Sequence, residues 1–309
     1  MSRVRIATRG SALALAQSRG VASRLAAALG VETEIVTVKT TGDRLAGPLA
    51  EAGGKGLFVK EVEEAVLERR ADLAVHSAKD LPGQLAPGLV LAAFPERADP
   101  RDALVARDPG ATLDGLPRGA RVGTGSLRRG SQLLARRPDL RIEPMRGNVD
   151  TRLRKLESEA LDAVVLACAG LERLGLGDRI TERIAPDALL PAVGQGTLAL
   201  EAREGDPLVA SLGAIDHEPT RIATLAERAF LQRLTGDCNV PLAALAELRD
   251  EGRVALGGLL ASPDGRLVLR ADADAPTGEP ARAGQAAAEA VLRQGGDALL
   301  ATLRAEAPS

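Results

Sequence analysis

The chain has 309 residues, 45% of them hydrophobic, which supports two or three folded domains and excludes disorder as the dominant state. Its 40 basic and 42 acidic residues give a net charge of −2, and three Phe are its only aromatic residues, which disfavours a nucleic-acid binder. Arginines interrupt the first 30 residues, so neither a signal peptide nor a membrane span is indicated. We therefore expect a soluble cytoplasmic protein that binds neither nucleic acid nor membrane.

The first third of the chain predicts a parallel sheet covered by helices, because strand-like and helix-like runs alternate in the order βαβαβ. The expected elements are a strand over Val4–Thr8, a helix from Ser11 to Leu29, a strand over Glu34–Thr40, a helix near Phe58–Arg69 and a short buried strand over Asp72–His76.

A Pro-rich segment from Pro82 to Pro100 then indicates a hinge, after which the α/β pattern restarts. The restart predicts strands over Arg121–Gly123, Arg141–Glu143 and Ala163–Ala167, and helices over Leu127–Arg136 and Val149–Leu156. Two similar α/β halves are therefore expected.

The last third predicts a separate α+β domain. A helix over Glu218–Leu234 precedes three strand-like runs, near Leu242–Leu248, Val254–Leu260 and Leu267–Ala271, and an Ala-rich helix follows to the end. Asp-Glu-Gly and Pro-Asp-Gly turns between the runs favour an antiparallel sheet.

The run His76-Ser77-Ala78-Lys79-Asp80 directly follows a predicted parallel strand, at the end where open α/β sheets bind ligands. Asp80 suits a general acid or a stabiliser of a cationic intermediate, and Ser77 and Lys79 suit an anionic ligand. The alternative is a solvated loop with a turn before Pro82.

Arginines gather in the second half, and several of them follow turns that open helices. Gly123, Gly125 and Ser126 lead into a helix start that attracts anions, and guanidinium groups bind carboxylates in pairs. A polyanionic ligand fits this pattern, although an Arg-Arg pair such as Arg136-Arg137 is more often a solvated helix face. The arginines concerned are Arg128, Arg129, Arg146, Arg152, Arg154 and Arg173.

The two cysteines have different settings. Cys238 lies on a Gly-Asp-Cys-Asn turn, where a thiol is accessible, whereas Cys168 adjoins an apolar strand and should pack as a small hydrophobic residue. A metal site and a disulfide framework are not expected, and no cysteine-protease signature accompanies His76 or His217.

Taken together, these segments resemble the porphobilinogen deaminase family, also called hydroxymethylbilane synthases. The resemblance covers most of the chain, and its motifs occur in a fixed order. They are Arg5–Gln17 (RIATRGSALALAQ), Gly53–Glu61 (GGKGLFVKE), Ala71–Pro82 (ADLAVHSAKDLP), Asp99–Ala103 (DPRDA), Val122–Arg129 (VGTGSLRR), Arg146–Leu153 (RGNVDTRL), Ala169–Gly175 (AGLERLG), Leu190–Gly196 (LPAVGQG) and Ala226–Pro241 with its GDCNVP.

The resemblance implies a transferase that condenses four porphobilinogen molecules, releases four ammonia molecules and frees hydroxymethylbilane by hydrolysis, in the biosynthesis of porphyrins and heme. Cys238 matches the cysteine that carries a dipyrromethane cofactor through a thioether, and Asp80 matches the catalytic carboxylate. The chemistry agrees, because loss of ammonia leaves an electron-poor azafulvene cation that a carboxylate stabilises.

The resemblance also implies two sets of binding residues, since each pyrrole unit bears an acetate and a propionate arm. The set near the cofactor is Ser77, Lys79, Asp80, Thr124, Ser126, Arg128, Arg129, Arg146 and Gly147. The set near the substrate is Arg9, Ser11, Gln17, Lys55, Phe58, Arg146, Arg152, Arg173 and Gln195, with Lys55 and Phe58 on a loop over the cleft.

The family's architecture implies two periplasmic-binding-protein-like lobes with mostly parallel sheets and a C-terminal α+β domain with a three-stranded antiparallel sheet. Residues 1–97 with 196–215 would form the first lobe, 100–192 the second, and 218–309 the domain that bears the cofactor cysteine. A monomer is expected.

The chain departs from the family pattern at two positions: Glu51 replaces a common Lys, and Gly125 replaces a common Ser. Neither departure touches Asp80 or Cys238. The alternative function is a non-catalytic two-lobed protein that binds or senses anions, because a fold of this kind serves both purposes.

Overall fold

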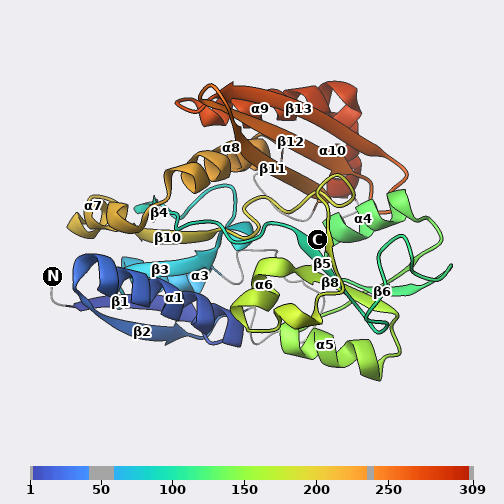
Figure 1. Ribbon diagram of the computed structural model, residues 1–309. Helices are drawn as coiled ribbons and strands as arrows, with labels where there is room; N and C mark the ends of the chain where they lie inside the picture. Colours follow the sequence, from blue (N-terminus) through green and yellow to red (C-terminus); the bar gives the residue numbers. More distant parts are fainter. Residues whose placement is uncertain (1–2, 42–58, 235–239, 306–309) are drawn as a thin grey trace.

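The structure is a computed structural model that describes residues 3–41, 59–234 and 240–305. Within these residues, two five-stranded sheets and one three-stranded sheet form three bodies. Figure 1 shows the body that contains β1 and the body that contains β8 side by side, with the C-terminal body over both. We call them the first lobe, the second lobe and the C-terminal domain.

The first lobe is built on a sheet in the order β2-β1-β3-β10-β4. β1 pairs in parallel with β2 and β3, whereas β10 runs antiparallel to β3 and β4. The strands are β1 (Arg3–Arg9), β2 (Glu32–Val38), β3 (Leu73–Ser77), β4 (Leu89–Ala93) and β10 (Leu198–Arg203), and the helices are α1 (Ala12–Leu29), α3 (Lys60–Leu67) and α7 (Pro207–Leu212).

The helix α1 has the ends that the sequence predicts. The Ser11 hydroxyl accepts a hydrogen bond from the Ala14 N–H, and Gly30 ends the helix with a φ of 64°, which glycine adopts without strain. The lobe core packs Ile6, Leu25 and Leu73, none of which is exposed.

The second lobe repeats this plan with the strand order β7-β6-β8-β5-β9. β6 is parallel to β7 and β8, and β5 is antiparallel to β8 and β9. The strands are β5 (Asp102–Ala106), β6 (Arg121–Gly123), β7 (Arg141–Glu143), β8 (Ala163–Ala167) and β9 (Glu182–Ile184), and the helices are α4 (Leu127–Arg136), α5 (Val149–Ser158) and α6 (Cys168–Arg173).

The chain crosses between the lobes twice, over residues 94–101 from β4 to β5 and over residues 185–197 from β9 to β10. We call these the first and second crossing segments. The first strand after each crossing, β5 or β10, is the one that runs against its neighbours. The expectation of mostly parallel lobes is therefore confirmed, with one reversed strand in each sheet.

The C-terminal domain packs α8 (Glu218–Leu234) and α9 (Pro280–Val291) on an antiparallel sheet of β11 (Leu242–Arg249), β12 (Arg253–Ala261) and β13 (Val268–Pro276). The expected three-stranded meander is confirmed. The expectation of one Ala-rich terminal helix is wrong, because the chain reaches a φ of 104° at Gly295 before α10 (Asp297–Ala305).

Side-chain amides and guanidinium groups of α8 attach this domain to the first lobe. Arg228 donates from Nη2 to the carbonyls of Pro82 and Gly83 at 3.0 Å, and Gln232 donates to Gly83 at 2.7 Å. The loop that follows Asp80 is thereby fixed to α8. No helix in the described ranges is both long enough and apolar enough to cross a membrane.

Candidate active site

The carboxyl end of β3 presents the predicted polar run. β3 ends at Ser77, and a single 3₁₀ turn over Ala78–Asp80 follows. Gln17 of α1 donates to the Ser77 hydroxyl at 2.8 Å, and the Ala78 N–H donates to Thr197 of the second crossing segment at 3.0 Å. Helix, strand and crossing segment therefore hold this turn from three sides.

His76 belongs to the sheet rather than to this polar turn. It is buried, and its Nε2 lies 3.0 Å from Oε2 of Glu201 on β10. The other histidine, His217, has Nδ1 2.8 Å from the Thr220 hydroxyl. Each imidazole is thus bonded to another side chain of the described residues.

Lys79 is partly buried, and charged groups of both lobes act on it electrostatically. Burial lowers the pKa of Lys79 to about 8, and the adjacent Asp80 carboxylate opposes that shift. The guanidinium groups of Arg129 and Arg128, in the second lobe, lower it further. A first-lobe ammonium therefore faces second-lobe cations.

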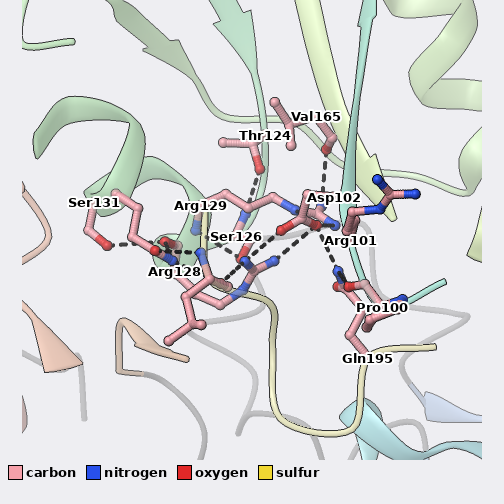
Figure 2. Close-up of polar contacts among 12 residues, drawn as sticks. Pro100, Arg101, Asp102, Thr124, Ser126, Arg128, Arg129, Ser131, Val165 and Gln195 are labelled. Atoms are coloured by element: carbon pink, nitrogen blue, oxygen red, sulfur yellow. Dashed lines mark hydrogen bonds and ion pairs between the residues drawn. The ribbon is translucent and has the colours of Figure 1, made fainter. Parts of the chain in front are cut away.

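Arg128 and Arg129 lie in the first turn of α4 and point to one carboxylate, Asp102 of β5 (Figure 2). Arg128 Nη1 is 2.7 Å from Oδ2 of Asp102, and Arg129 Nη2 is 2.7 Å from Oδ1. Ser126 caps this helix by accepting from the Arg129 N–H, and the Thr124 hydroxyl accepts from the Ser126 N–H at 3.2 Å. The turn predicted to bind anions is thus an ordered helix start.

Arg152 of α5 approaches the same place from the other side of the second lobe. Its Nε donates to the Gly147 carbonyl at 2.8 Å. Burial lowers the pKa of Arg152 to about 10; the charge of Arg129 acts in the same direction, and that of Asp80 acts against it. The charges of Asp80 in the first lobe and Arg152 in the second lobe therefore attract each other.

The loop that bears Arg146 packs on the turn before α4. A Cβ built on Gly125 would lie 2.2 Å from the Met145 carbonyl oxygen, so the backbones approach as closely as glycine permits. The departure at Gly125 from the Ser of the family pattern is thus a steric requirement here.

Two further predicted residues flank the lobe boundary. Arg173, at the end of α6, donates from Nη2 to the Gly196 carbonyl of the second crossing segment at 2.6 Å, and burial lowers its pKa to about 10. Gln195 donates from Nε2 to the Pro100 carbonyl and to Asp102 Oδ1, at 2.8 Å and 3.0 Å. Both link the second lobe to the crossing segments.

Arg9 and Ser11 lie at the carboxyl end of β1 and at the start of α1, and both are partly exposed. Cys238, Lys55 and Phe58, together with the departure at Glu51, lie outside the described residues. Cys168 is buried as expected, and burial raises the pKa of its thiol to about 11, so it is an inert packing residue.

Asp102 is the buried residue that sequence reasoning missed. It falls in the DPRDA stretch, and the only local signal is a single acidic residue that opens an otherwise apolar strand. Such a residue predicts a buried partner, but the sequence does not indicate which cation. Among the described residues, no group of three or more His, Cys, Asp and Glu could hold a metal ion.

The charge balance suits an acid-bearing ligand. Lys79, Arg128, Arg129 and Arg152 interact with two carboxylates, Asp80 and Asp102. Burial together with mutual repulsion lowers the pKa values of Lys79, Arg129 and Arg152. A ligand with several carboxylates would relieve this excess of positive charge. The donor set therefore fits a dipyrromethane with acetate and propionate arms.

Comparison with known proteins agrees over almost the whole length. Residues 4–211 match the family model described as "Porphobilinogen deaminase, dipyromethane cofactor binding domain", and residues 222–293 match "Porphobilinogen deaminase, C-terminal domain". A porphobilinogen deaminase of Syntrophotalea carbinolica is 50% identical over 98% of this chain and 96% of the relative. That of Roseiflexus castenholzii is 53% identical over 96% and 98%, respectively.

A more distant likeness exists among solved structures. A periplasmic substrate-binding protein of an ABC transporter from Coxiella burnetii shares 15% identity at a TM-score of 0.44, over 69% of this chain and 91% of that chain.

Proposed function

Because this chain belongs to the porphobilinogen deaminase family, we propose that the residues gathered between its lobes carry out that family's reaction. The enzyme condenses four porphobilinogen molecules stepwise, releases one ammonia at each addition and frees hydroxymethylbilane by hydrolysis. The observation that carries the assignment of roles is the electrostatic attraction between Asp80 of the first lobe and Arg152 of the second lobe.

Asp80 is the catalytic carboxylate. Departure of ammonia from the aminomethyl group of the substrate leaves a delocalised cation, and a fixed anion beside it lowers the energy of that state. A carboxylate within reach of the pyrrole N–H also accepts or returns its proton. Arg152 and Lys79 both attract the Asp80 carboxylate electrostatically.

The cations bind the acidic arms of the pyrroles. Guanidinium groups form two parallel hydrogen bonds with a carboxylate, and an ammonium acts as a compact point charge. Residues that would hold the cofactor arms are Ser77, Lys79, Thr124, Ser126, Arg128, Arg129, Arg146 and Gly147. Residues that would hold the incoming substrate are Arg9, Ser11, Gln17, Arg146, Arg152, Arg173 and Gln195, joined by Lys55 and Phe58.

The dipyrromethane, when bound through a thioether to Cys238, supplies the first pyrrole carbon to which substrate is joined. This chain's own contribution is to hold both flanks of the Cys238 turn. Arg228 and Gln232 fix α8 to the loop after Asp80, and the Ala244 N–H of β11 donates to the Pro191 carbonyl of the second crossing segment at 3.1 Å. The described residues before and after Cys238 are therefore bonded to the first lobe and to the second crossing segment.

We also propose that the protein is a cytoplasmic monomer with porphobilinogen as its substrate. The division into 1–97 with 196–215, 100–192 and 218–309 is part of the proposal, and the membership of the three sheets supports it.

Intact-mass spectrometry with a turnover assay tests this function against non-catalytic anion binding. The enzyme, purified from cells that make porphobilinogen, should exceed the chain mass by two linked pyrrole units and should consume porphobilinogen. A bare chain mass without porphobilinogen consumption would instead favour the binding protein.

A further inference from the structure

Asp102 is among the most heavily hydrogen-bonded carboxylates of the described chain, and it is completely buried. Its Oδ1 accepts from Arg129 Nε at 2.9 Å, Arg129 Nη2 at 2.7 Å, Arg128 Nη2 at 3.2 Å and Gln195 Nε2 at 3.0 Å. Its Oδ2 accepts from Arg128 Nη1 at 2.7 Å. Burial would raise the pKa of this carboxyl, but the two guanidinium groups hold it well below its usual range. Asp102 is therefore a permanent anion.

The two cationic partners of Asp102, Arg128 and Arg129, are consecutive residues at the positive end of α4. Arg128 and Arg129 repel each other, and burial lowers the pKa of Arg129. Both side chains are nearly inaccessible, with exposed fractions of 6% and 7%. Without Asp102 the two guanidinium groups would separate or turn toward water.

The arrangement leaves hydrogen-bond donors for a ligand. Each guanidinium also donates to a backbone carbonyl. Arg128 donates to the Leu190 carbonyl at 2.8 Å, and Arg129 donates to the Val165 carbonyl at 3.0 Å. Since a guanidinium has five N–H bonds and each makes three contacts here, each keeps two without an acceptor among the described residues. The net charge of the two guanidinium groups and Asp102 is +1.

We propose that Asp102 is a positioning residue, which fixes the guanidinium groups of Arg128 and Arg129 for the carboxylates of the pyrrole ligand before that ligand binds. Asp102 is also linked to both crossing segments, because the Gln195 amide donates to Asp102 and to the Pro100 carbonyl. The inference rests on the proposed function, in which these arginines hold the cofactor arms.

The test measures cofactor loading rather than activity. Full-length protein from cells unable to make porphobilinogen is mixed with porphobilinogen, and intact mass records the gain of two pyrrole units over time. Asp102→Asn keeps the shape and removes the charge, so loading should slow by about tenfold or more. Asp99→Asn is the matched control, because Asp99 lies three residues earlier and also pairs with two arginines, Arg101 and Arg183. Its loading should match that of the wild type.

A second comparison covers the case in which Asp102→Asn does not fold. Arg128→Gln combined with Arg129→Gln removes both groups that Asp102 positions, so adding Asp102→Asn to that double variant should slow loading no further. A further tenfold loss in the triple variant would show that Asp102 acts independently of these arginines and would overturn the proposal. So would wild-type loading by a folded Asp102→Asn protein. A wild-type chain that never gains the mass would instead refute the proposed function.

Discussion

The guanidinium of Arg97 forms a two-pronged ion pair with the carboxylate of Glu227, 2.6 Å from Nη1 to Oε1 and 3.2 Å from Nη2 to Oε2. Glu227 has no solvent exposure, and it also accepts from the N–H groups of Gly194 and Ala246, at 2.6 Å and 2.9 Å. One side chain of α8 thus joins both crossing segments to the strand that follows the Cys238 turn.

Glu227→Gln should destabilise the protein by about 3–5 kcal/mol, because it leaves the partly buried guanidinium of Arg97 without its counter-charge. Chemical denaturation measures the free energy of unfolding. Glu289→Gln is the control, because Glu289 of α9 pairs with Arg233 of α8, the helix that also carries Glu227. Both side chains of this pair are exposed, so its loss should cost less than about 1 kcal/mol. Equal effects of the two substitutions would contradict this role for Glu227.

Gly125→Ser should lower the melting temperature, although the family pattern in this motif has Ser there. The added Cβ meets the Met145 carbonyl oxygen, and overpacking of this kind costs about 1–3 kcal/mol. The loop with Arg146 must shift, so KM for porphobilinogen should rise as well. In the control Gly20→Ser, the new Cβ has nothing within 4 Å, and melting should be unchanged or higher. A Gly125→Ser protein as stable as the wild type would refute the steric account.

The sequence predicted those elements whose signals are local. Ser11 and Gly30 delimit α1, and the Asp-Glu-Gly and Pro-Asp-Gly turns delimit the C-terminal meander. It did not predict β4 or β10, because the first lies between prolines and the second is an Ala- and Leu-rich run that suits a helix equally well. Their pairing depends on partners far away in the chain, which no local pattern reports.

The candidate site also has a part that the sequence predicts and a part that it does not. The polar run after β3 was predictable from its position at a strand end, and the family resemblance added the arginines. The role of Asp102 was not predictable, because its partners Arg129 and Gln195 lie 27 and 93 residues away. Only the fold brings them to one carboxylate.

Lys79 predicts a pH dependence of substrate binding. Since its pKa is about 8, the ammonium is mostly charged at pH 7 and mostly neutral at pH 9, so KM should rise about tenfold over that interval. The same depressed pKa means that folding stability rises with pH between about 8 and the ordinary lysine value, as the desolvated charge is lost.

Lys79→Arg should flatten the KM profile, because a guanidinium remains charged over the whole range. Steady-state kinetics at pH 7, 8 and 9 compare the two proteins, and titration of the substrate itself cancels in their ratio. Superimposable profiles would exclude Lys79 as the group responsible.

Cys238→Ser should give the bare chain mass and no turnover, since a serine hydroxyl is a far weaker nucleophile than a thiolate. Cys168→Ala is the control, because that thiol is buried in the second lobe, and its removal should leave the added mass in place. An active Ser variant of unmodified mass would remove Cys238 from the proposed role.

The most direct test of the account is to measure loading and turnover together in Asp80→Asn. The variant keeps the shape and loses the charge, so it should still carry two pyrrole units, whereas kcat should fall by about 100-fold or more. Asp72→Asn, next to the opposite end of β3 and paired with Arg5, should keep both properties. Near-normal turnover in Asp80→Asn would contradict the claim that a fixed anion between the lobes drives the reaction.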